Sequence, residues 1–191
     1  MGSVGDCNSV CVAESLDGIV WHKPNLTTGP RPGTNVVFDD PPVDTATVWR
    51  DERADSKERY KLAIVPTNGT VSELAAAHGY YQLYSSADGI TWNLRVNRTG
   101  PTEDGDTIFY NPYRDKWVWS IKGLSYYSKS LGGITQGPWD RHRLYRETND
   151  LFGPDSQWRP EELVPWYIAF HADHSPTSPP HLVLFHGIFV F

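Results

Sequence analysis

Two acidic positions lie beside expected β-strands, where side chains are held firmly enough to do chemistry, and a third lies in a less regular segment. Asp51 closes the strand expected over 45–51, Asp106 precedes the strand expected over 107–110, and Glu162 lies in a proline-flanked segment. Two carboxyl groups on either side of a glycosidic bond can protonate the leaving oxygen and attack the sugar or activate water. Asp51, Asp106 and Glu162 are therefore candidate catalytic residues.

These positions also have simpler interpretations. The charged run Arg50 to Arg53 is equally consistent with a solvated strand end, and the Asp104-Gly105-Asp106 segment favours an ordinary polar turn. Glu161 competes with Glu162 as the candidate acid. The four histidines near the end of the chain have spacings that fit no metal-ligand set, so no metal or cofactor is expected. They are His171, His174, His181 and His186.

Composition restricts the classes of partner. Aromatic residues make up 13% of the chain, and exposed aromatic rings can pack against the apolar face of a sugar. The net charge is −6 and there is no basic stripe, which argues against nucleic acid. No stretch reaches the roughly 18 apolar residues that would span a bilayer. Residues 1–10 lack the features of a signal peptide, so the compartment is open, as is the oligomeric state.

The periodicity of apolar residues predicts an all-β chain. Short runs of alternating or continuous apolar residues are separated by Gly, Pro, Asn and Asp, which are typical of turns. One segment, 71–77, favours two turns of helix. Cys11 is expected to be a buried strand residue. The main expected strands are 11–15, 35–38, 45–51, 59–65, 80–85, 107–110, 116–121, 124–127 and 141–146.

A turn motif recurs along the chain and sets its organisation. Ser15–Trp21 and Ser86–Trp92 share the order Ser-x-Asp-Gly-Ile-x-Trp at an offset of 71 residues, and 130–134 is a weaker echo. Each of the first two motifs joins two expected strands. Hairpins also recur, at 48–62 and 108–118. Together they predict a repeat of three or four antiparallel strands, which is the size of one propeller blade.

Several segments are similar to one family. The stretch 13–26 resembles a segment of five-bladed β-propellers of the glycoside hydrolase family 32/43 type, as do 49–52 and 105–112. The segments 116–118 and 157–166 fit the same group. The resemblance spans roughly residues 10–167 and implies an incomplete five-bladed β-propeller. Its expected parts are the end of a blade (1–28), a blade (29–97), a blade (98–145), and a partial blade with an irregular tail (146–191).

The resemblance implies hydrolysis of glycosidic bonds in the full-length protein, with carbohydrate as the substrate. It implies that Asp51 binds sugar hydroxyls and stabilises the transition state, with Arg50 beside it. The matched segments make Trp49 and Asn111 candidate substrate-binding residues, and Asp104 is a third candidate from the acidic cluster before the strand expected over 107–110. The family's Arg-Asp-Pro motif reads Arg-Asp-Glu here. Two alternatives stay open: a non-catalytic propeller module that binds glycans or partners, and an inactive truncated fragment.

Overall fold

The chain folds into two compact units. The computed structural model describes residues 8–67, 79–102, 105–123 and 142–168. Within that part, the first unit takes in 8–67 and 81–97, and the second takes in 79–80 and everything from residue 98 onward. Each unit is built around its own four-stranded antiparallel sheet.

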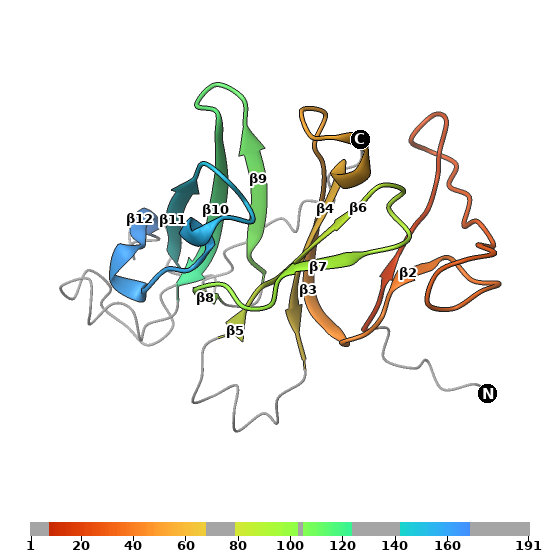
Figure 1. The fold of residues 1–191 in the computed structure, drawn as a ribbon, viewed down its shortest axis with the longest axis horizontal. Coiled ribbons are helices and arrows are strands. Elements are labelled where there is room, and N and C mark those ends of the chain that lie inside the picture. The colour runs from red at the N-terminus through yellow and green to blue at the C-terminus, as the bar shows by residue number, and fades with distance from the viewer. Residues whose placement is uncertain (1–7, 68–78, 103–104, 124–141, 169–191) are drawn as a thin grey trace, which may run out of the picture. The chain divides into compact units, whose positions relative to one another are not determined.

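The sheet of the first unit has the order β3-β4-β6-β7 (Figure 1). Its strands are β3 (Val43–Arg50), β4 (Tyr60–Pro66), β6 (Gln82–Ser86) and β7 (Asn93–Val96). The two central strands, β4 and β6, are almost entirely buried, and each pairs with a strand on either side. The edge strand β3 alternates between inward and outward side chains instead, as its mixed sequence predicts.

The core of this unit lies on one face of the sheet. Leu62 and Ile64 are two residues apart on β4 and point to the same side. Phe38 and Tyr84 meet edge to face there, with ring centroids 4.8 Å apart. Val43 completes the buried cluster, against which Val10 and Trp92 pack.

Shorter elements flank the first sheet. The two-residue strand β1 (Val10–Cys11) pairs with β2 (Val36–Phe38), and a 3-10 turn (Ser56–Glu58) joins β3 to β4. Cys11 is exposed, so the expectation of a buried cysteine is wrong. On this short strand Val10, rather than Cys11, points toward the core.

The sheet of the second unit has the order β12-β11-β10-β9. Its strands are β9 (Thr107–Asn111), β10 (Lys116–Gly123), β11 (His142–Thr148) and β12 (Val164–Ile168). The small pair β5 (Gly79–Tyr80) and β8 (Pro101–Thr102) belongs to the same unit. Two 3-10 turns, Pro154–Ser156 and Pro160–Glu162, lie between β11 and β12.

An aromatic pair forms the core of the second unit. Trp119 is fully buried and meets Trp158 edge to face at 4.7 Å. Both indole N–H groups donate hydrogen bonds, to Thr148 and to the backbone oxygen of Pro101. A Cβ at Gly100 would overlap the Trp158 ring, so glycine is required at that position.

The repeated turn motif has the same internal structure in both copies. The hydroxyl of Ser15 accepts from the N–H of Gly18 (2.8 Å), and a carboxylate oxygen of Asp17 accepts from Ile19 (2.8 Å) and Val20 (2.9 Å). In the second copy, the corresponding bonds to Ser86 and Asp88 measure 2.9, 2.8 and 2.8 Å. Both glycines have positive φ, at 72° and 76°. The predicted equivalence therefore extends to individual hydrogen bonds.

The structure confirms the all-β expectation. No sheet closes on itself among the described residues, and two successive four-stranded antiparallel sheets are consistent with an incomplete propeller-like fold. The expected boundary between the blade 98–145 and the partial blade 146–191 falls inside β11. In the structure β12 pairs with β11, so residues on both sides of that boundary belong to one sheet. The expected helix 71–77, the strand 124–127 and the echo 130–134 lie outside the described residues. No described helix is long and apolar enough to cross a membrane.

Candidate functional site

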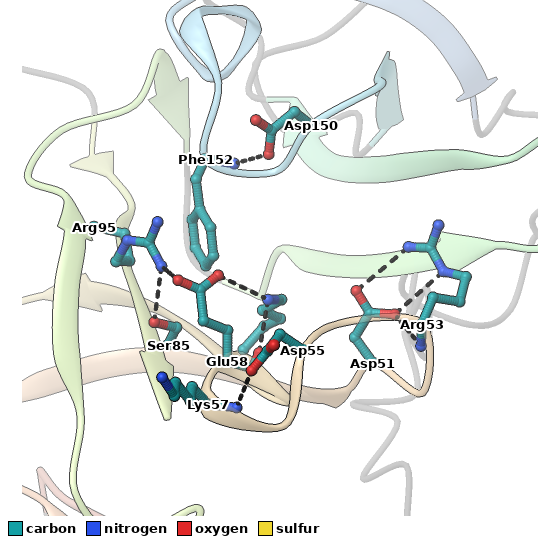
Figure 2. Close-up of polar contacts among 10 residues, drawn as sticks. Asp51, Arg53, Asp55, Lys57, Glu58, Ser85, Arg95, Asp150 and Phe152 are labelled. Carbon is teal, nitrogen blue, oxygen red and sulfur yellow. Dashed lines mark hydrogen bonds and ion pairs between the residues drawn. The ribbon is translucent and has the colours of Figure 1, made fainter. Parts of the chain in front are cut away.

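Asp51 lies at the end of β3, in the hairpin that leads to β4. Its side chain is only 8% exposed. One carboxylate oxygen accepts from the backbone N–H of Arg53 (3.1 Å) and from its Nε (3.2 Å), and the other accepts from Nη2 (3.4 Å). Figure 2 shows this chelate around Asp51. The carboxylate is thus held rigidly by its own turn.

The two neighbours of Asp51 that were expected to bind substrate point in different directions. Successive side chains on a strand alternate between faces, so Trp49 and Arg50 lie on opposite sides of β3. Trp49 is half-buried. Arg50 is exposed and pairs with Glu52 at 2.8 Å.

A second polar cluster in the first unit was missed by sequence reasoning. Glu58 pairs with Arg95 of β7, which also donates to Ser85 of β6 (3.2 Å) (Figure 2). Lys61 of β4 donates to the backbone oxygen of Glu58 at 2.7 Å. These contacts tie three strands to the 3-10 turn, and they place one carboxylate between two cations. Only the final register of the sheet brings the residues together.

Asp106 is buried at the start of β9, and its side chain has no exposed surface. It accepts a hydrogen bond from the backbone N–H of Lys122 and lies 3.7 Å from the guanidinium of Arg143. Arg143 also donates to the backbone oxygens of Ser120 and Gly105. Asp106 therefore joins the ends of three strands. Asp104 lies outside the described residues.

Glu162 lies on the 3-10 turn before β12. It is exposed, pairs with Arg146 at 3.0 Å, and accepts from the backbone N–H of Arg159. Arg146 and Arg143 are three residues apart on β11, so they leave the strand on opposite faces. The partners of Glu162 and Asp106 thus come from different sides of one sheet. Asp51 belongs to the first unit, while these two acids belong to the second.

The remaining candidate, Asn111, lines an open depression on one face of the second sheet. The depression has a volume of about 230 Å³ and is mainly apolar. It is smaller than the roughly 300–1,000 Å³ of drug-sized sites, which suits a ligand about the size of one ring. Its lining residues are Phe109, Asn111, Val118, Tyr145, Val164, Pro165 and Trp166.

Two aromatic side chains form one wall of this depression. Tyr145 of β11 and Trp166 of β12 meet edge to face, with ring centroids 5.1 Å apart. Trp166 keeps 52% of its surface exposed. A large aromatic side chain usually loses more of its surface than this, so the exposed indole is available to a ligand.

A charged network anchors Tyr145. Its hydroxyl donates a hydrogen bond to Glu147. Arg114 donates to both oxygens of that carboxylate, from Nε at 2.5 Å and from Nη2 at 2.9 Å. The hydrogen bond from Arg114, followed by that from Tyr145, lowers the pKa of Glu147. Burial, followed by the hydrogen bond to Glu147, raises the pKa of Tyr145 to about 12. At neutral pH the tyrosine is therefore protonated and the glutamate ionised.

Sequence reasoning identified Asn111 but missed the other side chains of the aromatic wall and its network. Tyr145 and Glu147 are two residues apart on β11, and this spacing could have indicated that their side chains share one face of the strand. Trp166 follows Pro165, and because of the prolines in this segment no strand was predicted there. Arg114 reaches Glu147 from the turn between β9 and β10, and no local pattern indicates that contact.

Comparisons with known proteins identify no family for the chain. No protein-family model matches it, and no curated protein matches it. Among the residues that the structure describes, no three His, Cys, Asp or Glu side chains converge as metal ligands. The four C-terminal histidines lie outside that part of the chain.

Proposed function

We propose that the chain is a non-catalytic carbohydrate-binding module that takes up a sugar ring in the depression of the second unit. The exposed indole of Trp166 beside Tyr145 is the observation that carries the proposal. An aromatic face provides a flat apolar platform, and a sugar ring has one apolar face and hydroxyls around its edge. Asn111 supplies polar contact in the same depression.

The arrangement of the carboxylates also favours binding over cleavage. Catalysis of glycoside hydrolysis needs two carboxyl groups, roughly 5–10 Å apart, that face the same sugar. Asp51, Asp106 and Glu162 are each bound to an arginine instead.

The test is a titration of the intact chain with a panel of neutral monosaccharides and short glycans, followed by tryptophan fluorescence and calorimetry. We expect binding to at least one sugar, and a loss of about tenfold or more in affinity with Trp166→Ala. Trp21→Ala is the matched control, because Trp21 is also exposed but belongs to the first unit. Absence of binding across the panel, or equal losses in both variants, would refute the proposal.

Hydrolysis of glycosidic bonds is the second candidate. It rests on the family resemblance and on Asp51, whose carboxylate is rigid and nearly buried at a strand end. Turnover of aryl glycosides that falls by about a hundredfold or more in Asp51→Asn would favour it. Asp17→Asn is the control, because Asp17 is an exposed turn residue. If the folded chain turns over no glycoside, this candidate is eliminated.

A further inference from the structure

The strand segment 12–15, which leads into the first copy of the turn motif, is paired on one side only among the described residues. We propose that its other side binds an extended segment of a partner protein. This segment adds as an antiparallel strand and places an aromatic residue opposite Ser15 and a basic residue opposite Glu14. Strand addition at an open sheet edge is a common mode of peptide recognition. The segment 12–15 belongs to the first unit, so the proposal is independent of the depression in the second.

Hydrogen bonds occupy one side of this strand segment. Glu14 exchanges backbone hydrogen bonds with His22, at 2.8 and 2.7 Å, and Val12 donates to a backbone oxygen at 2.9 Å. The backbone groups of successive residues on an antiparallel strand point to opposite sides, so those of Ala13 and Ser15 point away from these partners. Within the described residues, neither of these two N–H groups makes a hydrogen bond. The edge is therefore able to accept a further strand.

The second copy of the turn shows which neighbour fits this edge. The pair Glu14–His22 corresponds to the pair Ser85–Asn93 of β6 and β7, at the same offset of 71 residues. On its other side, β6 pairs with β4. Within the described residues, the segment 12–15 thus has the neighbour that β7 provides in the second copy and lacks the one that β4 provides.

An aromatic residue lies opposite the serine that opens the second turn. Tyr60 of β4 pairs with Ser86, and its ring lies 3.8 Å from the position that a Cβ of Gly89 would take. Among the described residues, nothing lies within 4 Å of the equivalent position at Gly18. An aromatic side chain opposite Ser15 would therefore cover the exposed turn and gain a cross-strand contact.

A related turn after β11 repeats this feature in the second unit. A carboxylate oxygen of Asp150 accepts from the N–H of Phe152 at 2.9 Å, as that of Asp88 does in the second copy. Thr148 takes the place of the serine, and it pairs with Trp117 of β10. In both turns whose first strand is paired on two sides, the residue opposite the serine or threonine is thus aromatic.

Glu14 adds a charge to the recognition. The corresponding position in the second copy is Ser85, which pairs with Lys61. Glu14 is exposed and makes no ion pair within the described part of the chain. Opposite charges that face each other across two strands stabilise the pairing, and like charges destabilise it. The net charge of −6 also favours a basic segment over a second copy of this acidic chain.

The probe is a fluorescently labelled peptide with the sequence of residues 59–66, which carries Tyr60 followed by Lys61. It is titrated with the intact chain, and binding is followed by fluorescence anisotropy. We expect saturable binding with a dissociation constant below about 1 mM. Tyr60→Ala in the peptide should weaken binding about threefold, because the cross-strand aromatic contact is lost.

An exchange of charges locates the contact. Glu14→Lys in the chain should weaken binding about fivefold, and Lys61→Glu in the peptide should restore most of the loss. Asp44→Lys is the matched control, because it makes the same change in net charge at an exposed position of β3 and should leave binding unchanged. Ala13→Pro removes an edge N–H group and should also weaken binding. Glu14→Lys keeps the test decisive if Ala13→Pro does not fold.

Three results would overturn the proposal. The first is no binding of the peptide to the wild-type chain at about 1 mM. The second is an equal effect of Glu14→Lys and Asp44→Lys without rescue by the exchanged peptide, which would indicate general electrostatic attraction. The third is a dimer of the chain that the peptide dissociates, which would assign the edge to a second copy. None of these results bears on carbohydrate binding, which is measured at the depression of the second unit.

Discussion

Asp88 and Asp17 make the same hydrogen bonds in two turns that have different surroundings. Burial opposes ionisation of Asp88, but hydrogen bonds from Thr91, Ile90 and Ser86 outweigh it and lower its pKa below 3.8. The turn also touches the core, because Trp92 packs on the buried cluster of the first unit. We expect Asp88→Ala to lower the free energy of unfolding by about 1–2 kcal/mol, measured by urea denaturation.

Asp17→Ala provides the internal control for this prediction, because it removes an equivalent network from a turn whose apolar residues are exposed. We expect a smaller loss of stability there. The pKa of Asp88 is lowered in the folded state, so its contribution is present above its unfolded pKa and is lost as the pH falls through the folded value. The difference between wild type and Asp88→Ala should therefore shrink as the pH falls below the usual pKa of an aspartate and through the lowered folded pKa. Equal losses in both alanine variants would contradict the argument.

At the scale of elements, strands with a strong pattern could be predicted, whereas the edge strands β7 and β12 could not. The apolar runs of β4 and β10 and the alternation of β3 and β9 identify them directly. The strand β7 carries mostly exposed residues, and β12 contains Pro165. Each pairs with one neighbouring strand, β7 with β6 and β12 with β11, and such pairing is a tertiary effect with no local sequence signal.

In the candidate site, too, the features set by local sequence could be predicted and those set by strand pairing could not. Asp51 and Asp106 were correctly placed at strand ends, because turn residues and apolar runs set those boundaries. Their arginine partners were not foreseen: Arg143 reaches Asp106 across the sheet, and that contact depends on strand register. The wall formed by Tyr145 and Trp166 likewise depends on β12 pairing with β11.

At the scale of the whole molecule, the two copies of the turn differ in how far neighbouring residues cover their apolar side chains. In the second copy, Ile90 packs against the backbone near Gly29, a residue of the loop that follows the first copy. The first copy leaves its equivalent residue, Ile19, 82% exposed. It also has Leu16 and Val20 where the second copy has Ala87 and Thr91. The more apolar copy is thus the uncovered one, an arrangement that favours association with another surface.

This contrast predicts that the exposed apolar residues of the first turn account for most of the hydrophobic-dye binding and self-association of the chain. The double variant Leu16→Ala, Val20→Thr gives the first turn the residues that the second already tolerates, so its hydrogen bonds should persist. We expect lower binding of a hydrophobic dye and less self-association in sedimentation, with an unchanged melting temperature, because the removed side chains contact solvent. Val48→Thr, at an exposed valine of β3, should change neither readout. Unchanged dye binding in the double variant would show that the first turn is not the surface through which the chain binds the dye or associates. The exposure of its apolar residues would then have no energetic consequence for the free chain.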